Sequence, residues 1–277
     1  MAYYLLHGDA NDASGNGYHG TMTELVPTTD RFNQANGALQ FNGTTSAIDV
    51  PYSLPFNVDP FTITAWINWA GSCPNTYTAY SECVIFMREN MYALAVRDGT
   101  LQFAIGTLSA KTNSWQWINT DVKIQANQWT HVALQFDKGS IASVYINGKF
   151  IKSNLYPDRV LYADPFIMYY GIPLSIGRRT ALGGTPFYGA LSDIRIYNRV
   201  LTVEELGQLA ENNTPQFTTA WINWDGICPN HYWDDNEVLS LAESQFMHSL
   251  CGAEHYSLQF IHWTNRGLGL IRVLQCL

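Results

Sequence analysis

Oxygen-bearing side chains crowd one glycine-rich segment near the start of the chain, residues 8–20, with the sequence GDANDASGNGYHG. The side chains are those of Asp9, Asn11, Asp12, Ser14 and Asn16. Calcium binds roughly six to eight oxygen atoms from carboxylates, amides and backbone carbonyls, with tolerant geometry, and glycine lets carbonyl groups turn inward. The segment is therefore a candidate calcium loop. The alternative is a loop whose Asx turns satisfy its own backbone without a metal.

Aromatic side chains in or beside the longest predicted loops form a second candidate site. Sugars stack their apolar faces on aromatic rings and offer hydroxyl groups to nearby polar groups, and such sites usually lie on loops at a pocket rim. We therefore expect Trp115, Trp117 and Tyr169 to bind carbohydrate. Trp66 and Trp129 fall inside predicted strands, where we expect core positions instead.

The acidic residues do not form a catalytic pattern. Glycoside hydrolysis uses two carboxylates that face the scissile bond, and the chain contains no Glu-x-Asp-x-x-Glu pattern. Glu204 and Glu205 fall on a predicted helix as solvated charges, and His131 falls within a predicted strand, as a structural histidine would. We predict no catalytic residues and no enzyme. A relative of the glycoside hydrolases is the alternative that these acids disfavour.

The composition is that of a folded globular protein. Of 277 residues, 47% are hydrophobic and 14% aromatic, which is enough for a packed core, and only 14% are charged, with a net charge of -8. The acidic balance argues against a nucleic-acid partner, because phosphates are bound by clustered lysine and arginine. No apolar run reaches the roughly 18 to 20 residues that cross a bilayer. We expect no membrane insertion, and no signal peptide is visible.

The cysteines show no zinc-finger spacing. Cys73 and Cys83 bracket one predicted loop. They either pair, as in an oxidising compartment, or remain free thiols, and the sequence leaves both readings open.

Residues 61–69, FTITAWINW, set the pattern that positions these side chains. Apolar residues alternate along the segment and both faces carry large groups, which predicts a central strand. Further strands are predicted at 3–6, 38–41, 47–50, 84–87, 93–97, 101–105, 115–122, 129–136, 143–146, 173–176 and 191–197. Strands at this spacing without long helices predict an all-β, antiparallel two-sheet sandwich. One short helix near the end is predicted by the capping box from Thr202 to Glu205.

Six segments carry a resemblance to a known family. They are GDANDASGNGYHG, NGALQFNGTTSAIDV, FTITAWINW, QWTHVALQFDKGSIASVYINGKFI, PLSIG and FYGALSDIRIYNRVLTVEEL, in register from Tyr3 to about Ala210. This part of the chain resembles the laminin-G-like jelly-roll domains of the concanavalin A-like lectin/glucanase superfamily. The resemblance implies a jelly roll of two curved antiparallel sheets. It also implies a non-catalytic binding or adhesion module, often with calcium, in secreted or cell-surface proteins.

The resemblance also implies a ligand set for the metal. In the family, calcium lies between the first loop and an acidic residue of the last strand, which corresponds here to Asp12, Asn16 and Asp193. Thr45 and Ser46 replace an acidic pair found in many relatives. We expect a calcium-stabilised module that binds glycan or extracellular matrix. A structural spacer of an adhesin or a virion fibre, without sugar binding, is the alternative.

A second copy of the central strand begins after the first domain. Residues 217–232, FTTAWINWDGICPNHY, repeat the segment around Trp69 at an offset of 155 positions, and the similarity ends near residue 246. With one base inserted there, a permitted codon choice for the following residues encodes a sequence close to YALAVRDGTLQFAI of residues 92–105. We therefore predict a domain at 1–212 and, at 213–277, a truncated second copy that is out of frame after about residue 246. A divergent natural extension is the alternative.

Overall fold

The computed structural model describes residues 1–52, 56, 59–74, 82–108, 113–138, 140–156, 160–161, 171, 173–179 and 186–211, together with the backbone of three later strands. The chain divides into two compact units, Met1–Asn212 and Asn213–Leu277. Within the described residues, no helix is long and apolar enough to cross a membrane.

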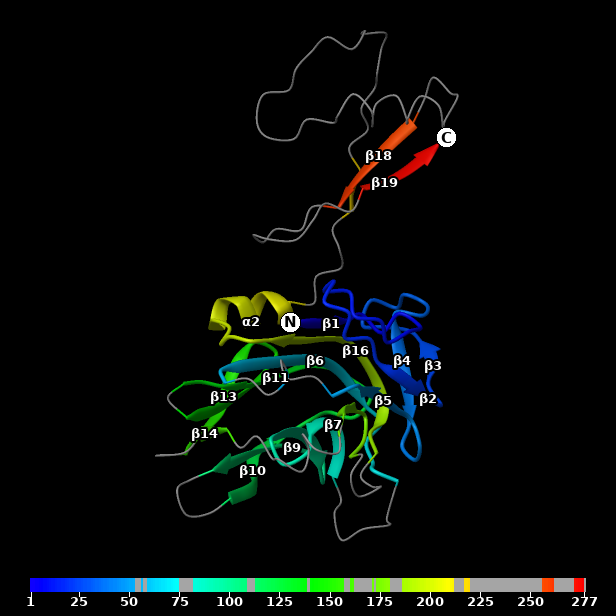
Figure 1. Cartoon of the computed structure of the whole chain (residues 1–277). Coiled ribbons are helices and arrows are strands. Elements are labelled where there is room, and N and C mark those ends of the chain that lie inside the picture. The colour runs from blue at the N-terminus through cyan, green and yellow to red at the C-terminus, as the bar shows by residue number, and fades with distance from the viewer. Residues whose placement is uncertain are drawn as a thin grey trace, which may run out of the picture. The chain divides into compact units, whose positions relative to one another are not determined.

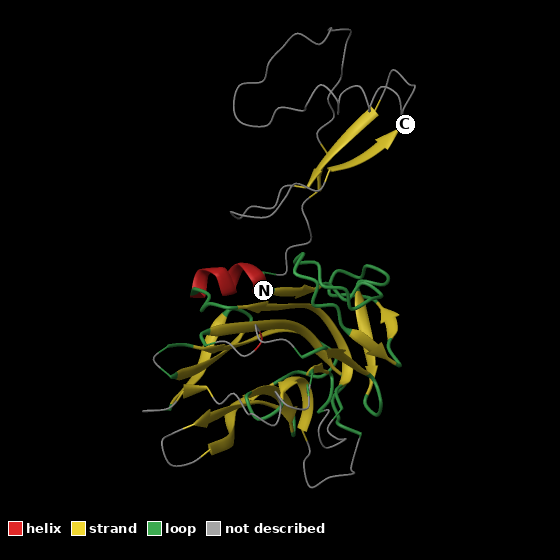
Figure 2. Ribbon diagram, viewed as in Figure 1, coloured by secondary structure: helices red, strands yellow, loops and turns green. Residues whose placement is uncertain are grey.

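The first unit is a two-layer antiparallel sandwich, which confirms the predicted fold class (Figures 1 and 2). The first sheet has the order β13 (Lys149–Leu155), β12 (Ile141–Ile146), β11 (Trp129–Phe136), β6 (Phe61–Trp69), β16 (Tyr188–Tyr197), β4 (Ala38–Asn42) and β3 (Val26–Thr28). Strand β1 (Ala2–Tyr4) pairs with β16 as well. Strand β6 is thus central, as its alternation predicts.

The second sheet packs against the first and has a comparable size. Its order is β10 (Asn113–Lys123), β9 (Thr100–Leu108), β8 (Tyr92–Arg97), β7 (Glu82–Arg88), β15 (Leu174–Ile176), β5 (Ala47–Val50) and β2 (Thr21–Thr23). Strand β14 (Val160–Leu161) pairs with β9. The inward side chains of both sheets, such as Ile63, Ile67, Leu94 and Phe103, form one large hydrophobic core. Burial of this apolar surface is the main force that holds the layers together.

Part of the outer face of the first sheet is covered by helix α2 (Val203–Ala210), the single helix that the described residues contain (Figure 2). The predicted capping box is present, because Thr202 Oγ1 accepts from Glu205 N–H and Glu205 accepts from Thr202 N–H. Leu206 packs in a cluster with Tyr145. The Trp66 indole N–H donates to Leu209 O at 3.2 Å. Both faces of β6 are therefore buried from Phe61 to Ile67, and Asn68 is half-buried.

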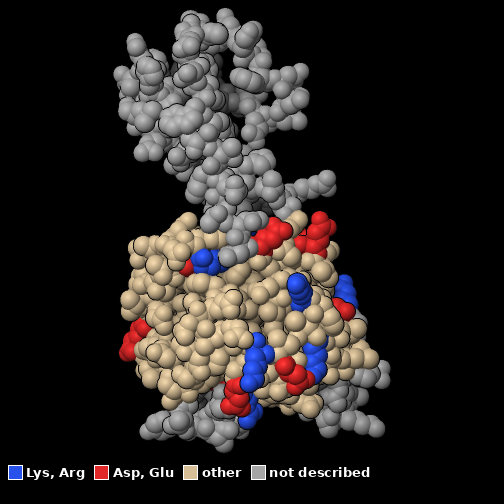
Figure 3. All heavy atoms as spheres, turned by 180° about the vertical axis from the view of Figure 1, so that it is seen from behind, with Lys and Arg blue, Asp and Glu red and all other residues tan. Residues whose placement is uncertain are grey.

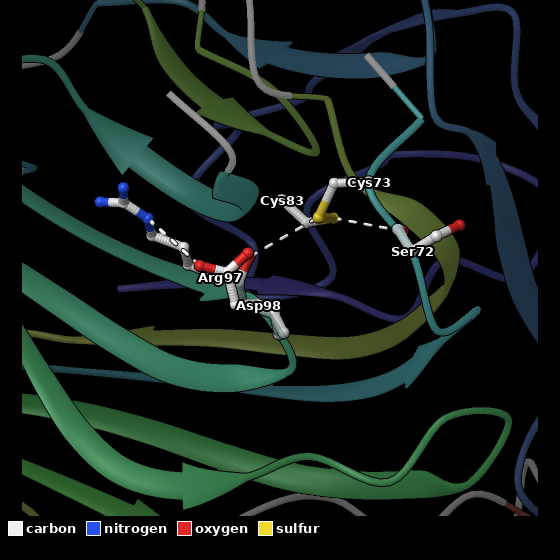
Figure 4. Close-up of a disulfide and its surroundings, with 6 residues drawn as sticks. Ser72, Cys73, Cys83, Arg97 and Asp98 are labelled. Atoms are coloured by element: carbon white, nitrogen blue, oxygen red, sulfur yellow. Dashed lines mark hydrogen bonds and ion pairs between the residues drawn. A yellow bond between two sulfur atoms is a disulfide. The ribbon is translucent and has the colours of Figure 1, made fainter. Parts of the chain in front are cut away.

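A disulfide joins Cys73 to Cys83, which decides between the two readings of these cysteines (Figure 4). It ties the segment that leaves β6 to the second residue of β7, and its Cα atoms are 5.5 Å apart. The bond therefore links the two sheets at one end of the sandwich.

The second unit contains the described strands β17 (Phe217–Thr219), β18 (Tyr256–Ile261) and β19 (Arg272–Cys276), which pair antiparallel in that order. Its interpretation as a truncated, out-of-frame second copy stays a prediction.

Candidate functional site

The Asp12 carboxylate is the centre of the first loop. One oxygen accepts from the backbone N–H groups of Tyr3 and Ser14, both at 2.9 Å, and the other accepts from Tyr18 N–H at 3.0 Å. Burial alone would raise the pKa of Asp12, but the hydrogen bonds from Ser14, Tyr3 and Tyr18 hold it below its ordinary value. The bond to Ser14 makes an Asx turn. In this structure, Asp12 orders the loop backbone directly.

Asn16 lies further along the same loop and is exposed. Its carboxamide nitrogen donates to Met1 O at 3.0 Å and to Ser14 Oγ at 3.1 Å. These bonds fasten the loop to the start of the chain.

Asp193, the third predicted metal ligand, lies on β16 between two arginines. Its carboxylate accepts from Arg195 Nε at 2.7 Å and from Arg31 Nη2 at 3.3 Å. Only 12% of the side chain is exposed. Burial alone would raise the pKa of Asp193, but the guanidinium of Arg195, followed by that of Arg31, lowers it. Arg195 also donates to Tyr3 Oη at 3.1 Å.

The three predicted calcium ligands do not form one donor set in this structure. The Asp12 carboxylate accepts a hydrogen bond from the backbone N–H of Tyr3. Asp193 is linked to the other end of Tyr3, because Arg195 donates both to Asp193 and to the Tyr3 hydroxyl oxygen. A calcium ion at Asp193 would have to displace two cationic partners. Within the described part of the chain, no three residues among His, Cys, Asp and Glu are grouped as a metal site. Calcium binding stays a prediction, and its nearest support is the loop around Asp12 and Asn16.

Trp115 and Trp117 lie side by side on the outer face of the second sheet. They are on edge strand β10, both half-buried, with ring centres 5.9 Å apart and ring planes at 84°. They pack against a small buried cluster on β7 and β8, formed by Val84, Met87, Ala93 and Ala95. Part of each ring stays exposed above this apolar base. Tyr169, the third predicted carbohydrate-binding residue, lies outside the described residues.

The residues beside this tryptophan pair are small because the strands leave little room. In register, Trp117 pairs with Ala104, and Trp115 with Gly106. A Cβ atom added to Gly106 would lie 1.7 Å from Asn90 O, so only glycine fits there. The backbone of Asn90 therefore lies directly against Gly106, next to the two large rings.

The acidic side chains on the outer face of the second sheet are paired with arginine. Glu82 lies 3.5 Å from Arg97, and Asp49 lies 2.9 Å from Arg178. Both acids are therefore held in ion pairs on this face of the sheet.

Charged side chains are few on the face that Figure 3 shows. In Figure 3, the described acidic and basic side chains on that face are sparse and interspersed among uncharged residues. That view shows no broad basic area over the described residues of the kind that binds phosphate backbones.

A family profile decides the classification. The profile described as the concanavalin A-like lectin/glucanases superfamily, of laminin G type, matches residues 42–207. The chain belongs to this superfamily. The predicted recognition is therefore confirmed. A comparison with curated proteins gives no match.

Several solved structures have a fold similar to that of this chain. Domain 4 of AbnA, a GH43 extracellular arabinanase from Geobacillus stearothermophilus solved with arabinotriose, is 24% identical with a TM-score of 0.54, over 76% of this chain and 97% of that domain. The botulinum neurotoxin type G receptor binding domain is 17% identical with a TM-score of 0.52, over 79% of this chain. The match spans 52% of that toxin domain.

The binding domain of Paraclostridial Mosquitocidal Protein 1 has a similar fold as well. It is 16% identical with a TM-score of 0.55, and the match covers 95% of this chain and 70% of that domain. At these identities, the likeness establishes a shared fold.

One aromatic residue differs from its predicted place. Trp66 is buried as expected, with 3% exposed, but Trp129 is half-buried and lines a groove with Tyr188 on the outer face of the first sheet. The prediction of a core position for Trp129 was wrong, because Trp129 is the first residue of β11 and lies beyond the cover of α2. Only the register of distant strands reveals this.

Proposed function

We propose that Met1–Asn212 is a non-catalytic carbohydrate-binding module of a secreted or surface-displayed protein, and that Trp115 and Trp117 contact the sugar. The observation that carries the proposal is the half-exposed, mutually perpendicular ring pair on edge strand β10. Rings held in this way stack on a sugar with little loss of side-chain entropy. A glycan on a matrix or cell surface is the expected partner.

Two observations support an extracellular setting and a sugar ligand. The Cys73–Cys83 disulfide suits an oxidising compartment. A similarly folded domain belongs to an extracellular arabinanase and was solved with arabinotriose. Calcium, held by the loop of Asp12 and Asn16, is a further part of the proposal.

A glycan array probed with the full chain and with Trp117→Ala tests the proposal. The variant is expected to lose retention on every glycan that depends on this face, with nearly unchanged melting, because a half-exposed ring contributes contact more than core. Phe150→Ala is the matched control, since Phe150 is an exposed aromatic residue (54%) on β13 of the other sheet.

Three outcomes would count against this site. If Trp117→Ala fails to fold, Trp117 is a core residue. If it keeps all glycan signals, the sugar lies elsewhere. If the unmutated chain retains no glycan, the alternative function of a structural spacer is favoured.

A further inference from the structure

A hollow lies on the outer face of the first sheet, on the side of the sandwich opposite to Trp115 and Trp117. It has a volume of about 480 Å³, which falls within the usual range for small-ligand sites, roughly 300 to 1,000 Å³. The walls come mainly from strands β4, β6, β11 and β16 and from residues 28–33, which begin at the last residue of β3. We call it the Trp129 groove, after the aromatic residue at one side.

Strand register explains why this surface is hollow. Trp129 of β11 pairs with Asn68 of β6, Asn68 pairs with Ala190 of β16, and Ala190 pairs with Gln40 of β4. Side chains in register across adjacent strands lie on one face. The row thus runs from a large ring, through a carboxamide and a methyl group, to a second carboxamide. Ala190 is the low point, and longer side chains rise on both sides of it.

The opposite wall is held firmly in place. Asp30 caps its own turn, with its carboxylate accepting from Phe32 N–H at 2.8 Å and Gln34 N–H at 2.9 Å. The Arg31 guanidinium lies over the rings of Phe32 and Trp66, at 4.4 and 4.6 Å from their centres. It also pairs with Asp193. A wall fixed by so many contacts does not need to reorganise when a ligand binds.

The chemistry of the lining is that of a sugar site. Trp129 and Tyr188, both half-buried, offer aromatic faces, and Asn68 and Gln40 offer carboxamides that both donate and accept hydrogen bonds. Neighbouring hydroxyl groups on a sugar ring require this combination. Two charged residues line the wall. Arg31 is paired with Asp193, and the Asp30 carboxylate accepts from backbone N–H groups of its own turn, so the groove suits a neutral ligand.

We propose that the Trp129 groove is a second saccharide-binding site, separate from the Trp115–Trp117 face. Its ligand class is a neutral pentose or hexose unit of a glycan. Because the two sites use residues of different sheets, this proposal stands whether or not the first face binds sugar. With both sites occupied, one module would hold two glycan chains.

The test follows the indole N–H signal of Trp129 in a ¹⁵N-labelled full chain by NMR, with the signal assigned from its loss in Trp129→Phe. Arabinotriose, lactose and cellotriose are added in turn at millimolar concentrations. At least one is expected to shift the Trp129 signal, and the shift is expected to persist in Trp117→Ala. If no sugar moves the signal, or if Trp117→Ala removes the shift, the proposal is overturned.

Two variants separate binding in the groove from a change elsewhere. Ala190→Leu fills the low point without removing any hydrogen-bonding group, and Gln40→Ala removes one carboxamide from the far side. Each is expected to weaken the sugar-induced shift about tenfold, while Trp117-dependent glycan retention is unchanged. If both variants fold and the sugar shifts the Trp129 signal with an unaltered dissociation constant, the proposal is overturned, since the sugar would then contact Trp129 from outside the groove.

Discussion

Replacing Asp193 by asparagine distinguishes two roles for this residue of β16, an ion-pair partner of arginine and a calcium ligand. In the structure, Asp193 neutralises Arg195 and Arg31. Asparagine has nearly the same shape but no charge, so the change leaves two partly buried guanidinium groups uncompensated. Under the calcium hypothesis, the same substitution would act by removing a metal ligand. The two explanations predict different results in a chelator.

The magnitude follows from burial. The side chains of Arg31, Asp193 and Arg195 are 13%, 12% and 19% exposed. Removing one partner from a buried ion pair costs roughly 3 to 5 kcal/mol. For a unit of this size, 1 kcal/mol corresponds to about 2 to 4 °C in melting temperature. We expect Asp193→Asn to melt roughly 10 °C lower.

The assay is thermal unfolding followed by circular dichroism, in EDTA and in millimolar calcium. If the ion pair is the cause, the loss is the same in both solutions. If Asp193 binds calcium, the loss is seen in calcium and disappears in EDTA. Asp121→Asn is the control, since Asp121 is 75% exposed and pairs with Lys152 at 3.0 Å, a surface pair worth about 1 kcal/mol or less. A melting temperature for Asp193→Asn equal to that of the control would refute the reasoning.

Three other predictions concern the first unit. Burial lowers the pKa of His131 from 6.5 to about 4, so the unfolded state takes up a proton at a higher pH than the folded state does. The free energy of unfolding should therefore fall by about 3 kcal/mol as pH drops from 6.5 to 4. Urea midpoints measured across this pH range should show the fall for the unmutated chain and lack it for His131→Gln. Reducing the Cys73–Cys83 disulfide should cost about 3 kcal/mol through loop entropy, and an unchanged midpoint after reduction would contradict this. Deleting residues 213–277 should leave the melting temperature unchanged, because the large core lies within Met1–Asn212; a lower value on calorimetry would show that the second unit supports the first.

Local patterns predicted the parts of the fold that local physics determines. Strand β6 alternates apolar residues over its whole length, and the box of Thr202 and Glu205 satisfies the first turn of α2 from within four residues. Strands β3 and β13 were missed, because edge strands expose most of their side chains and lose the alternation. Pro27 in β3 also argues against a strand until its edge position is known.

The candidate sites depend on contacts between distant residues, which the sequence alone does not show. Asp193 and Arg195 are two residues apart, so their ion pair could be predicted from the sequence. Arg31, which also pairs with Asp193, is 162 positions away, and that contact could not be predicted. The Trp129 groove exists because Ala190 lies in register with Asn68. Neither fact can be obtained from periodicity, which says which face a residue takes but not which neighbour it meets.

The position of β16 has a consequence for synthesis of the chain on the ribosome. This strand is the last of the first unit to be made, yet it lies between β6 and β4 and also receives β1. Until Tyr197 has emerged, the two halves of the first sheet have no common neighbour, and their unpaired edges are open to other chains. Closing contacts across as many as 192 positions is slow. Folding of the first sheet is therefore completed only after β16 has been translated.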